Sequence, residues 1–471
     1  MIDARNVVRN AAMFISSGVF AMFASFIIDI YLARTLGVDA YGRMSYAIAA
    51  TIFLYYLVDF GINMHGTTRV SKGENSLLES VGEIYPLKIT VAIVGFVLLC
   101  AVTLLFVDKE NQMLVILYGA SVFPVALSFD WVFQSIGKLK YAGIGKILYT
   151  GLMLLLIIFF VTKPDDVILV PVFQFAGLFV SFLFLVYVFR KEHSVPHFKI
   201  DMSRWKSIVT AAFPYGVTGS MTLLVWYVPS IFLEYFSGDA AVGYFNAADV
   251  LISSGVAIVG FYFYSVYPTF VKTIKDISVV QSYSAKIVLA VMTPICVGGI
   301  LLADKIILFF YGSEYILATA SLRLLLVSLW FLCLNQIYIF GLFSLEKQSS
   351  TVKVFAMQCM ATLFFCINFI PVFGAEGAAI SAIGCEIVAL PFFHLELSQH
   401  VKIRYAKNFA LSLLASGAMV AGILALESYL INNLFTSIAV GGILYMITAY
   451  CVHLFGEKEI RIIMNRGETI S

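Results

Sequence analysis

Long uninterrupted apolar runs restrict the fold of this chain more than any other feature. A helix needs about 20 apolar residues to cross the hydrocarbon core of a membrane, and runs of that length recur along all 471 residues. They cover residues 10–33, 41–63, 84–107, 112–136, 141–162, 167–189, 207–235, 241–268, 285–309, 321–345, 351–371, 374–397, 408–431 and 434–455. They lack the alternation of apolar and polar residues that strands of a membrane barrel show. The sequence therefore predicts an all-α polytopic membrane protein with about 14 transmembrane helices.

Composition excludes a soluble globular domain, a disordered chain and a coiled coil. Hydrophobic residues make up 61% of the chain and charged residues 12%, against about 45–50% and about 25% in soluble proteins. The net charge of +2 favours no nucleic-acid partner. The seven cysteines lie in apolar runs without a CxxC pair, which predicts neither a disulfide framework nor a metal site. No glycine loop that could hold a phosphate is present, so we expect no cofactor.

The distribution of basic residues predicts the orientation. With the N-terminus in the cytoplasm, 24 of the 30 Lys and Arg residues lie on the cytoplasmic side of the predicted spans. Basic residues are retained on that side during membrane insertion. An even number of spans then places both termini in the cytoplasm.

The chain resembles itself at an offset near 200 residues. Residues 36–42 match residues 237–243, and residues 85–89 match residues 283–287. Helices 1–6 and 7–12 would then form two lobes of the same orientation, an arrangement found in transporters that expose a site between their lobes. We therefore predict an N-lobe over 1–190, a cytoplasmic linker over 191–206, a C-lobe over 207–400, and helices 13–14 with a cytoplasmic tail over 401–471.

Short motifs near the N-terminus resemble the Wzx-type O-antigen and polysaccharide flippases. They are Tyr31–Gly37 (YLARTLG), Tyr41-Gly42, Asp59–Ile62 (DFGI) and Arg69–Ser71 (RVS). These flippases belong to the multidrug/oligosaccharidyl-lipid/polysaccharide exporter superfamily, with the multidrug/toxin extruders and the lipid II flippases. Lipid II flippases carry arginines in a central cavity, whereas no Arg or Lys falls at mid-depth in a predicted span here.

The resemblance implies a fold of two six-helix lobes that alternate in access. It implies an activity that moves an undecaprenyl-pyrophosphate-linked oligosaccharide, an O-antigen or related repeat unit, across the bacterial inner membrane. The expected partners are this lipid-linked oligosaccharide, membrane lipids and, as further candidates, other proteins of polysaccharide assembly.

Four lysines at matching places of the repeat are candidates for binding the substrate headgroup. Lys88 and Lys286 fall at the predicted starts of helices 3 and 9, and Lys146 and Lys353 at those of helices 5 and 11. Two symmetric lobes would place all four in one layer at the cytoplasmic mouth, where they could bind a pyrophosphate. The alternative, more common for such lysines, is that they anchor helix ends at the membrane surface.

Ionisable residues inside the spans are candidates for a polar cavity or for ion coupling. Asp29, Asp249 and Glu386 lie within predicted helices 1, 8 and 12, where such residues usually face a pathway through the protein. The alternative is a structural acid that pairs with a neighbouring helix. Arg34 lies on the outer side, five residues from Asp29, so that an ion pair between them would need help from another helix.

Three functions remain open on these grounds. The first is the flippase, and the second is an ion-coupled multidrug/toxin antiporter of the same fold. The third, a membrane polysaccharide polymerase, is disfavoured because the longest outer loop, residues 302–321, carries only Asp304, Lys305 and Glu314 as charged residues. The sequence thus predicts a transporter and not an enzyme.

Overall fold

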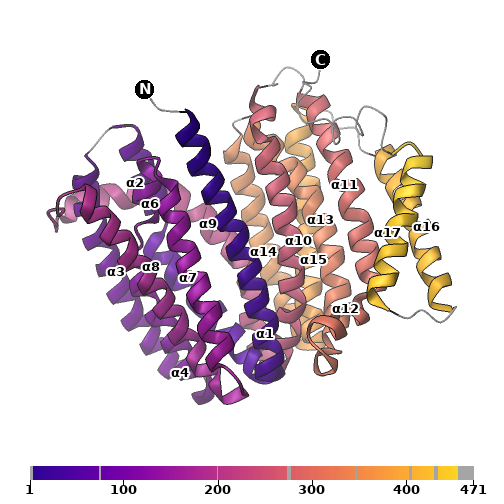
Figure 1. Cartoon of the computed structure of the whole chain (residues 1–471), viewed down its shortest axis with the longest axis horizontal. Helices are drawn as coiled ribbons and strands as arrows, with labels where there is room; N and C mark the ends of the chain where they lie inside the picture. The colour runs from indigo at the N-terminus through magenta and orange to yellow at the C-terminus, as the bar shows by residue number, and fades with distance from the viewer. Residues whose placement is uncertain are drawn as a thin grey trace. The chain divides into compact units, whose positions relative to one another are not determined.

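A computed structural model of the chain describes residues 4–73, 76–198, 200–272, 277–345, 347–401, 406–428 and 433–454 (Figure 1). In these ranges every regular element is a helix and no strand occurs, which confirms the predicted all-α class. The predicted cytoplasmic tail from residue 455 onward lies outside the described residues.

The described chain divides into two compact units, Met1–Asn246 (unit 1) and Ala247–Ser471 (unit 2). Unit 1 contains α1 (Ala4–Asp59), α2 (Ile62–Ser71), α3 (Leu77–Phe106), α4 (Lys109–Ala120), α5 (Val122–Ala126), α6 (Asp130–Ser135), α7 (Leu139–Phe160), η1 (Pro164–Ile168), α8 (Leu169–Glu192), α9 (Met202–Ser237) and the start of α10 (Asp239–Lys272). Unit 2 contains the rest of α10, α11 (Ile277–Leu301), α12 (Ala303–Phe310), η3 (Ser313–Tyr315), α13 (Ala318–Ser344), α14 (Gln348–Phe373), α15 (Ala375–Ser398), α16 (Ala406–Ser428) and α17 (Leu434–Cys451). α9, which we assigned to the C-lobe, packs on α1, α2 and α3 of unit 1. The lobe boundaries stay a prediction.

The membrane-spanning segments agree with a multi-pass membrane protein. Among the described residues, 12 helices are long and apolar enough to cross a membrane, or 13 if the bent pair Met202–Val217 and Gly219–Ser237 forms one span. This count takes Met13–Ser71 as one span, although a straight helix of that length would measure about 90 Å and the hydrocarbon core is about 30 Å thick. Gly37 interrupts this stretch with a φ of 74° and a ψ of 175°. The total of 14 stays a prediction. It would be reached if the bent pair is one span and if the stretch Met13–Ser71 crosses the membrane twice.

Apolar side chains on the long helices are widely exposed, as expected for helices in contact with lipid. Leu105, Phe106 and Phe159 are 76%, 81% and 72% exposed, and they lie near the ends of α3 and α7. Single exposed apolar residues are normal on soluble proteins, but continuous exposed apolar faces mark a contact with another apolar phase.

Two predicted spans are broken in the structure. The run 112–136 forms α4, α5 and α6. Pro124 explains the first break, because it lacks an N–H group and its ring clashes with the carbonyl group four residues earlier, at Ala120, where α4 ends. The run 285–309 ends as a single helix at Leu301, and α12 continues after Leu302.

The internal repeat has a counterpart in the backbone. Gly37 and Gly238, which occupy matching places in the two similar segments, have φ and ψ angles of 74° and 175°, and of 81° and 176°. Other residues rarely adopt a positive φ. A side chain at Gly42 would collide with the carbonyl oxygen of Asp239, and one at the matching Gly243 would collide with that of Val38. The two segments therefore pack against each other through equivalent glycines.

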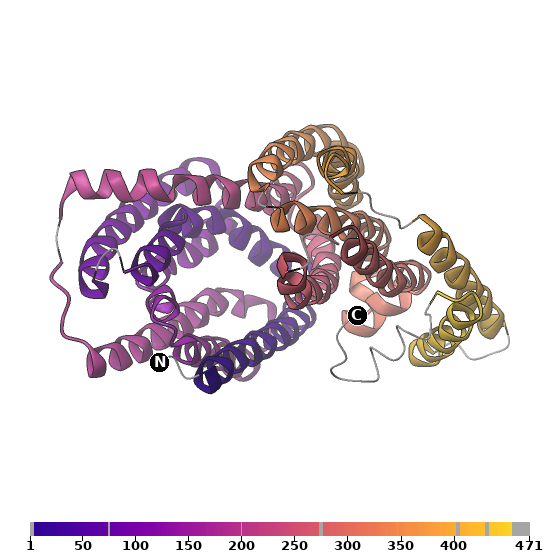
Figure 2. The same ribbon diagram turned by 90° about the horizontal axis from the view of Figure 1, so that it is seen from above.

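Helices α16 and α17 lie side by side, and α16 also packs on α11 (Figure 2). The hydroxyl group of Tyr445 in α17 donates to the carbonyl oxygen of Ala290 in α11 at 2.6 Å. Pro294 has no N–H group for that carbonyl, four residues earlier in the helix. Tyr445 therefore supplies the donor that the proline removes, and ties the last two helices to α11.

Candidate functional site

The DFGI motif forms the sharp turn between α1 and α2. Phe60 and Gly61 have φ angles of 31° and 78°, a region that favours glycine. A side chain at Gly61 would lie 2.9 Å from the backbone nitrogen of Gly216 in α9. The turn thus fits closely against α9, and it places Asp59 and Asn63 at the ends of the two helices that it joins.

Lys88 in α3 is the charged group that this turn covers. The Lys88 side chain is completely buried in this structure, and its Nζ donates to Asn63 Oδ1 at 2.9 Å. Asp59 Oδ1 lies 3.9 Å from the same Nζ, and the Asp59 side chain remains 31% exposed. A buried charge needs a compensating partner. Lys88 has a neutral amide in direct contact and a carboxylate at the limit of an ion pair.

The position of Lys88 corrects one expectation from the sequence. We expected this lysine at the start of helix 3, but α3 begins at Leu77, because Ser76 caps it by accepting from the backbone N–H of Glu79 at 3.2 Å. Lys88 therefore lies about 16 Å along the helix, within a candidate span. A fully buried ammonium group at this position differs from the exposed helix-end anchor that we gave as the alternative. The depth of Lys88 in the membrane and its role in binding the headgroup stay predictions.

Asp130 brings a second of the candidate lysines into the same region. This residue begins α6, and Ser128 Oγ donates to its Oδ2 at 2.7 Å. Both Lys88 and Lys146 lie close enough to attract its charge. The charges of two of the four lysines, Lys88 from α3 and Lys146 from α7, thus act on one carboxylate in unit 1.

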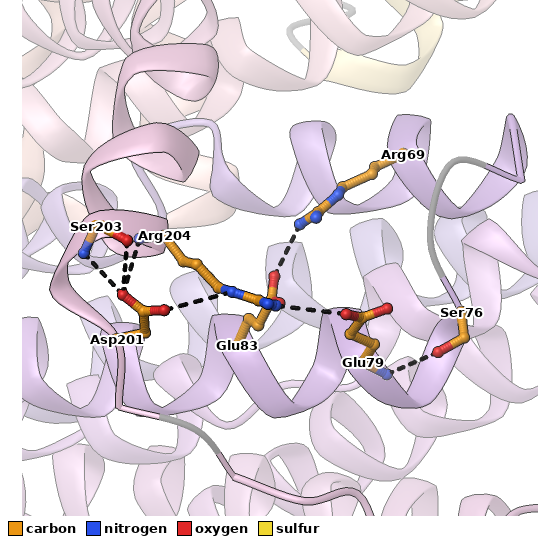
Figure 3. A network of polar contacts seen from close by, with 7 residues as sticks. All are labelled: Arg69, Ser76, Glu79, Glu83, Asp201, Ser203 and Arg204. Carbon is orange, nitrogen blue, oxygen red and sulfur yellow. Dashed lines mark hydrogen bonds and ion pairs between the residues drawn. The ribbon is translucent and has the colours of Figure 1, made fainter.

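Five residues before Lys88 on the same helix, Glu83 belongs to a network of charged side chains that also includes residues of α2 and α9 (Figure 3). Glu83 in α3 is 2% exposed and accepts from Arg69 Nη1 of α2 at 3.0 Å and from Arg204 Nη1 of α9. Arg204 also lies 3.4 Å from Glu79 and from Asp201. The two guanidinium groups satisfy the buried carboxylate and join α2, α3 and α9.

The first turn of α9 holds one arginine of this network in place. Asp201 caps the helix, because its Oδ1 accepts from the backbone N–H groups of Ser203 and Arg204 at 2.9 and 3.3 Å and from Ser203 Oγ at 2.8 Å. These hydrogen bonds, with the one from the Ser203 hydroxyl first, hold the pKa of Asp201 below its usual value.

Glu83 and its two arginines were not among the residues predicted from the sequence. A signal was present, since Ser76, Glu79 and Glu83 lie on consecutive turns directly before an apolar run. Ser followed three residues later by Glu is a helix-start pattern. It would have moved the start of the helix to Leu77 and placed Glu83 inside it.

The two candidate lysines of unit 2 stand in different surroundings. Lys286 is half-buried in α11, and Lys353 is exposed in α14. At the repeat offset that aligns Lys88 with Lys286, Glu83 corresponds to Gln281, a fully buried residue whose Nε2 donates to the carbonyl oxygen of Ile337 at 2.6 Å. The second repeat thus has a neutral amide where the first has a paired carboxylate. A single layer of all four lysines stays a prediction.

Among the acids in the spans, Glu386 has a well-defined partner. It is buried in α15, and Asn335 Nδ2 of α13 donates to Glu386 Oε2 at 2.6 Å and to its backbone oxygen at 3.0 Å. The side chain therefore links two packed helices. This geometry matches the structural role that the sequence analysis left open, and the coupling role stays a prediction.

Asp29 and Asp249 are half-buried in α1 and α10. Within the described ranges neither carboxylate has a hydrogen bond or an ion pair, although Asp29 lies within electrostatic reach of Tyr118 and Tyr149. Arg34 is exposed on α1, and its pairing with Asp29 stays a prediction. In the same described ranges no group of three His, Cys, Asp or Glu residues could hold a metal ion.

Similar proteins are known for the whole fold. A solved structure of the lipid II flippase MurJ in an inward closed conformation has a TM-score of 0.75 and 15% identity, covering 93% of this chain and 98% of that one. An inward-facing multidrug resistance MATE family transporter of the MOP superfamily has a TM-score of 0.65 and 15% identity, covering 80% and 95%. At these identities the likeness shows the fold.

The sequence comparisons give the family. A protein of Shigella dysenteriae named as a proposed O-antigen transporter is 23% identical over 78% of this chain and 94% of its own length. A protein of the same name from Escherichia coli strain K12 is 21% identical over 52% of this chain and 60% of its own length. The sequence pattern of the polysaccharide biosynthesis protein family matches residues 7–274. Because this match covers more than half of the chain, the protein belongs to the polysaccharide biosynthesis protein family, as a multi-pass membrane protein with the fold of flippases and drug transporters.

Proposed function

We propose that this protein is a flippase that moves an undecaprenyl-pyrophosphate-linked oligosaccharide from the inner to the outer leaflet of the bacterial inner membrane. The observation that carries the proposal is the buried Lys88, whose direct partner is the neutral side chain of Asn63. Membership of the polysaccharide biosynthesis family and the relatives named as proposed O-antigen transporters support the substrate class.

The chemistry of Lys88 suits a headgroup that binds briefly and then leaves. An ammonium group acts as a point charge that can turn toward a phosphate. Its carboxylate partner Asp59 is 3.9 Å away, so a pyrophosphate does not have to break a tight ion pair in order to approach it. The charge of Asp130 interacts with both Lys88 and Lys146, which supports a site that uses the two ammonium groups together.

The predicted orientation agrees with loading from the cytoplasmic leaflet. Lys88 lies in the first half of α3, the end that the distribution of basic residues assigns to the cytoplasm. A lipid-linked substrate made on the cytoplasmic side would meet this end first. With no nucleotide site in the sequence, the direction of transport would come from an ion gradient or from consumption of the flipped lipid.

The test separates a flippase from a drug antiporter of the same fold. The gene is expressed in a bacterial host that lacks its own O-antigen flippase, and surface polysaccharide and resistance to cationic dyes are measured together. We expect surface polysaccharide to return and dye resistance to stay at the level of the host. Dye resistance that rises without surface polysaccharide would contradict the proposal and favour the antiporter.

A further inference from the structure

An acceptor-rich group at the junction of α4, α9 and α10 is not explained by the proposed function. Asn111, in the first turn of α4, is 2% exposed, and its Nδ2 donates to Glu234 Oε1 of α9 at 3.4 Å and to Asp239 Oδ1 of α10 at 3.1 Å. The NH2 group of one buried amide thus donates to two half-buried carboxylates, and all three residues belong to unit 1.

This group lacks a hydrogen-bond donor. In the part of the chain that the structure describes, Asn111 Oδ1 is buried without any hydrogen-bond partner, a costly state for an amide oxygen. Turning the amide over would not help, because the oxygen would then face two carboxylates that only accept when ionised. The three side chains together therefore have one hydrogen-bond donor too few, whichever way the amide is turned.

The surrounding groups add further negative charge. The groups close enough to interact with Glu234 or Asp239 are mostly acidic, with one arginine and one tyrosine among them: Asp39, Arg43 and Tyr46 of α1, and Asp108 and Glu110 at the start of α4. Among these groups, one cation, Arg43, faces several carboxylates. Two carboxylates held by one amide amid further acids favour the uptake of positive charge.

We propose that Glu234, Asp239 and Asn111 form a binding site for one shared proton. Protonation of either carboxyl group creates the O–H donor that Asn111 Oδ1 lacks, while the other carboxylate keeps its hydrogen bond from Nδ2. The amide and the protonated carboxyl then form a reciprocal pair. A metal cation is the weaker candidate, because no group of three acidic, His or Cys residues in the described ranges is placed to hold one.

The location gives the proton a structural effect. Glu234 and Asp239 stand on either side of Gly238, the left-handed residue between α9 and α10, and the backbone of Asp239 packs against Gly42. Gain or loss of the proton would tighten or loosen the contact between α4 and this turn. That step to transport rests on the proposed flippase function, whereas proton binding itself does not.

The test measures the protonated carboxyl groups of the purified full-length protein by infrared spectroscopy, at pH 7 in a choline chloride buffer. Variants E234Q and D239N are made singly and together, and melting temperatures confirm that each is folded. Asp165, whose side chain is 89% exposed, provides the control variant D165N. Because an amide supplies an N–H donor to Asn111 Oδ1, the variants should fold at least as well as the parent.

We expect each single variant and the double variant to lose the same signal, that of one carboxylic acid, while D165N keeps it. This equality is the mark of one proton shared by two carboxyl groups. A double variant that loses two signals, or a single variant that loses none, would contradict the proposal. Loss of the signal in the parent protein when sodium replaces choline would show a sodium site instead.

Discussion

Helix α3 carries two buried charges five residues apart, and their surroundings differ. Glu83 is held by two guanidinium groups, from Arg69 and Arg204, which arrive from α2 and α9. Lys88 is held by the amide of Asn63, with Asp59 at 3.9 Å. Both side chains are buried, so burial alone does not distinguish them. The strength of the partners does.

This difference separates a structural joint from a candidate site. A carboxylate that is fully paired by charged donors has no capacity left for a ligand, and its loss leaves two arginines without their partner. A lysine with a neutral direct partner keeps much of its capacity for an anion. We therefore assign the fixing of α2, α3 and α9 to Glu83, whereas the binding of the substrate headgroup by Lys88 stays our proposal.

The largest loss of stability is expected for E83Q. Removal of one partner of a buried ion pair costs about 3 kcal/mol, so the melting temperature in detergent should fall strongly. E79Q is the matched control, because Glu79 lies one turn earlier, and its side chain is 38% exposed and pairs with the exposed Arg204 at 3.4 Å. It should melt close to the parent protein.

The same variant also tests the assignment of roles. E83Q protein that remains folded should still flip the lipid-linked substrate at a measurable rate. If E83Q melts like the parent protein but cannot flip the lipid, Glu83 takes part in transport and does not only hold the helices together.

A loss of transport without a loss of stability is expected for the acids in the spans. E386Q keeps the hydrogen bond from Asn335, which is 2.6 Å long in the structure, and removes only the ability to ionise. We expect E386Q to stall flipping in reconstituted vesicles, followed in effect by D249N and then by D29N. If all three variants flip at the parental rate and respond equally to a pH gradient, these acids are structural.

The smallest effect is expected at the cap that positions Arg204. The pKa of Asp201 is held below its usual value, so the charged form stabilises the folded state at neutral pH, and this stabilisation is lost as the pH falls through the folded pKa. The melting temperature of D201A should be slightly below that of the parent protein at pH 7, and the two should converge toward pH 3. D201N, which can still cap the helix, should lie between them. A difference that does not change with pH would rule out the charge of Asp201 as its source.

The apolar runs predicted the helices well where nothing but membrane depth sets their length. The runs 141–162 and 374–397 correspond to α7, Leu139–Phe160, and α15, Ala375–Ser398. Hydropathy did not reveal the polar first turns of α3, because their charges are compensated by arginines of two other helices. Arg69 lies before the helix, and Arg204 lies more than a hundred residues after it.

The sequence predicted residues of the candidate site, but it did not predict their burial or their partners. The repeat drew attention to Lys88, but its burial depends on the turn at Gly61, which brings Asn63 over it. For Glu386 the sequence left a structural and a coupling role open. The partner Asn335 comes from another helix, and no local pattern of residues predicts such a pair.

The central claim is that Lys88 carries positive charge for the substrate headgroup, and its direct test is flipping by K88Q in vesicles loaded with a fluorescent lipid-linked oligosaccharide. The glutamine retains a donor for Asn63 and removes the charge. The control is K191Q, which alters an exposed lysine at the end of α8. We expect K88Q to insert and melt like the parent protein, but to flip the lipid no faster than vesicles that contain the lipid and no protein. K191Q should flip the lipid at the parental rate. Parental flipping by K88Q would contradict the account.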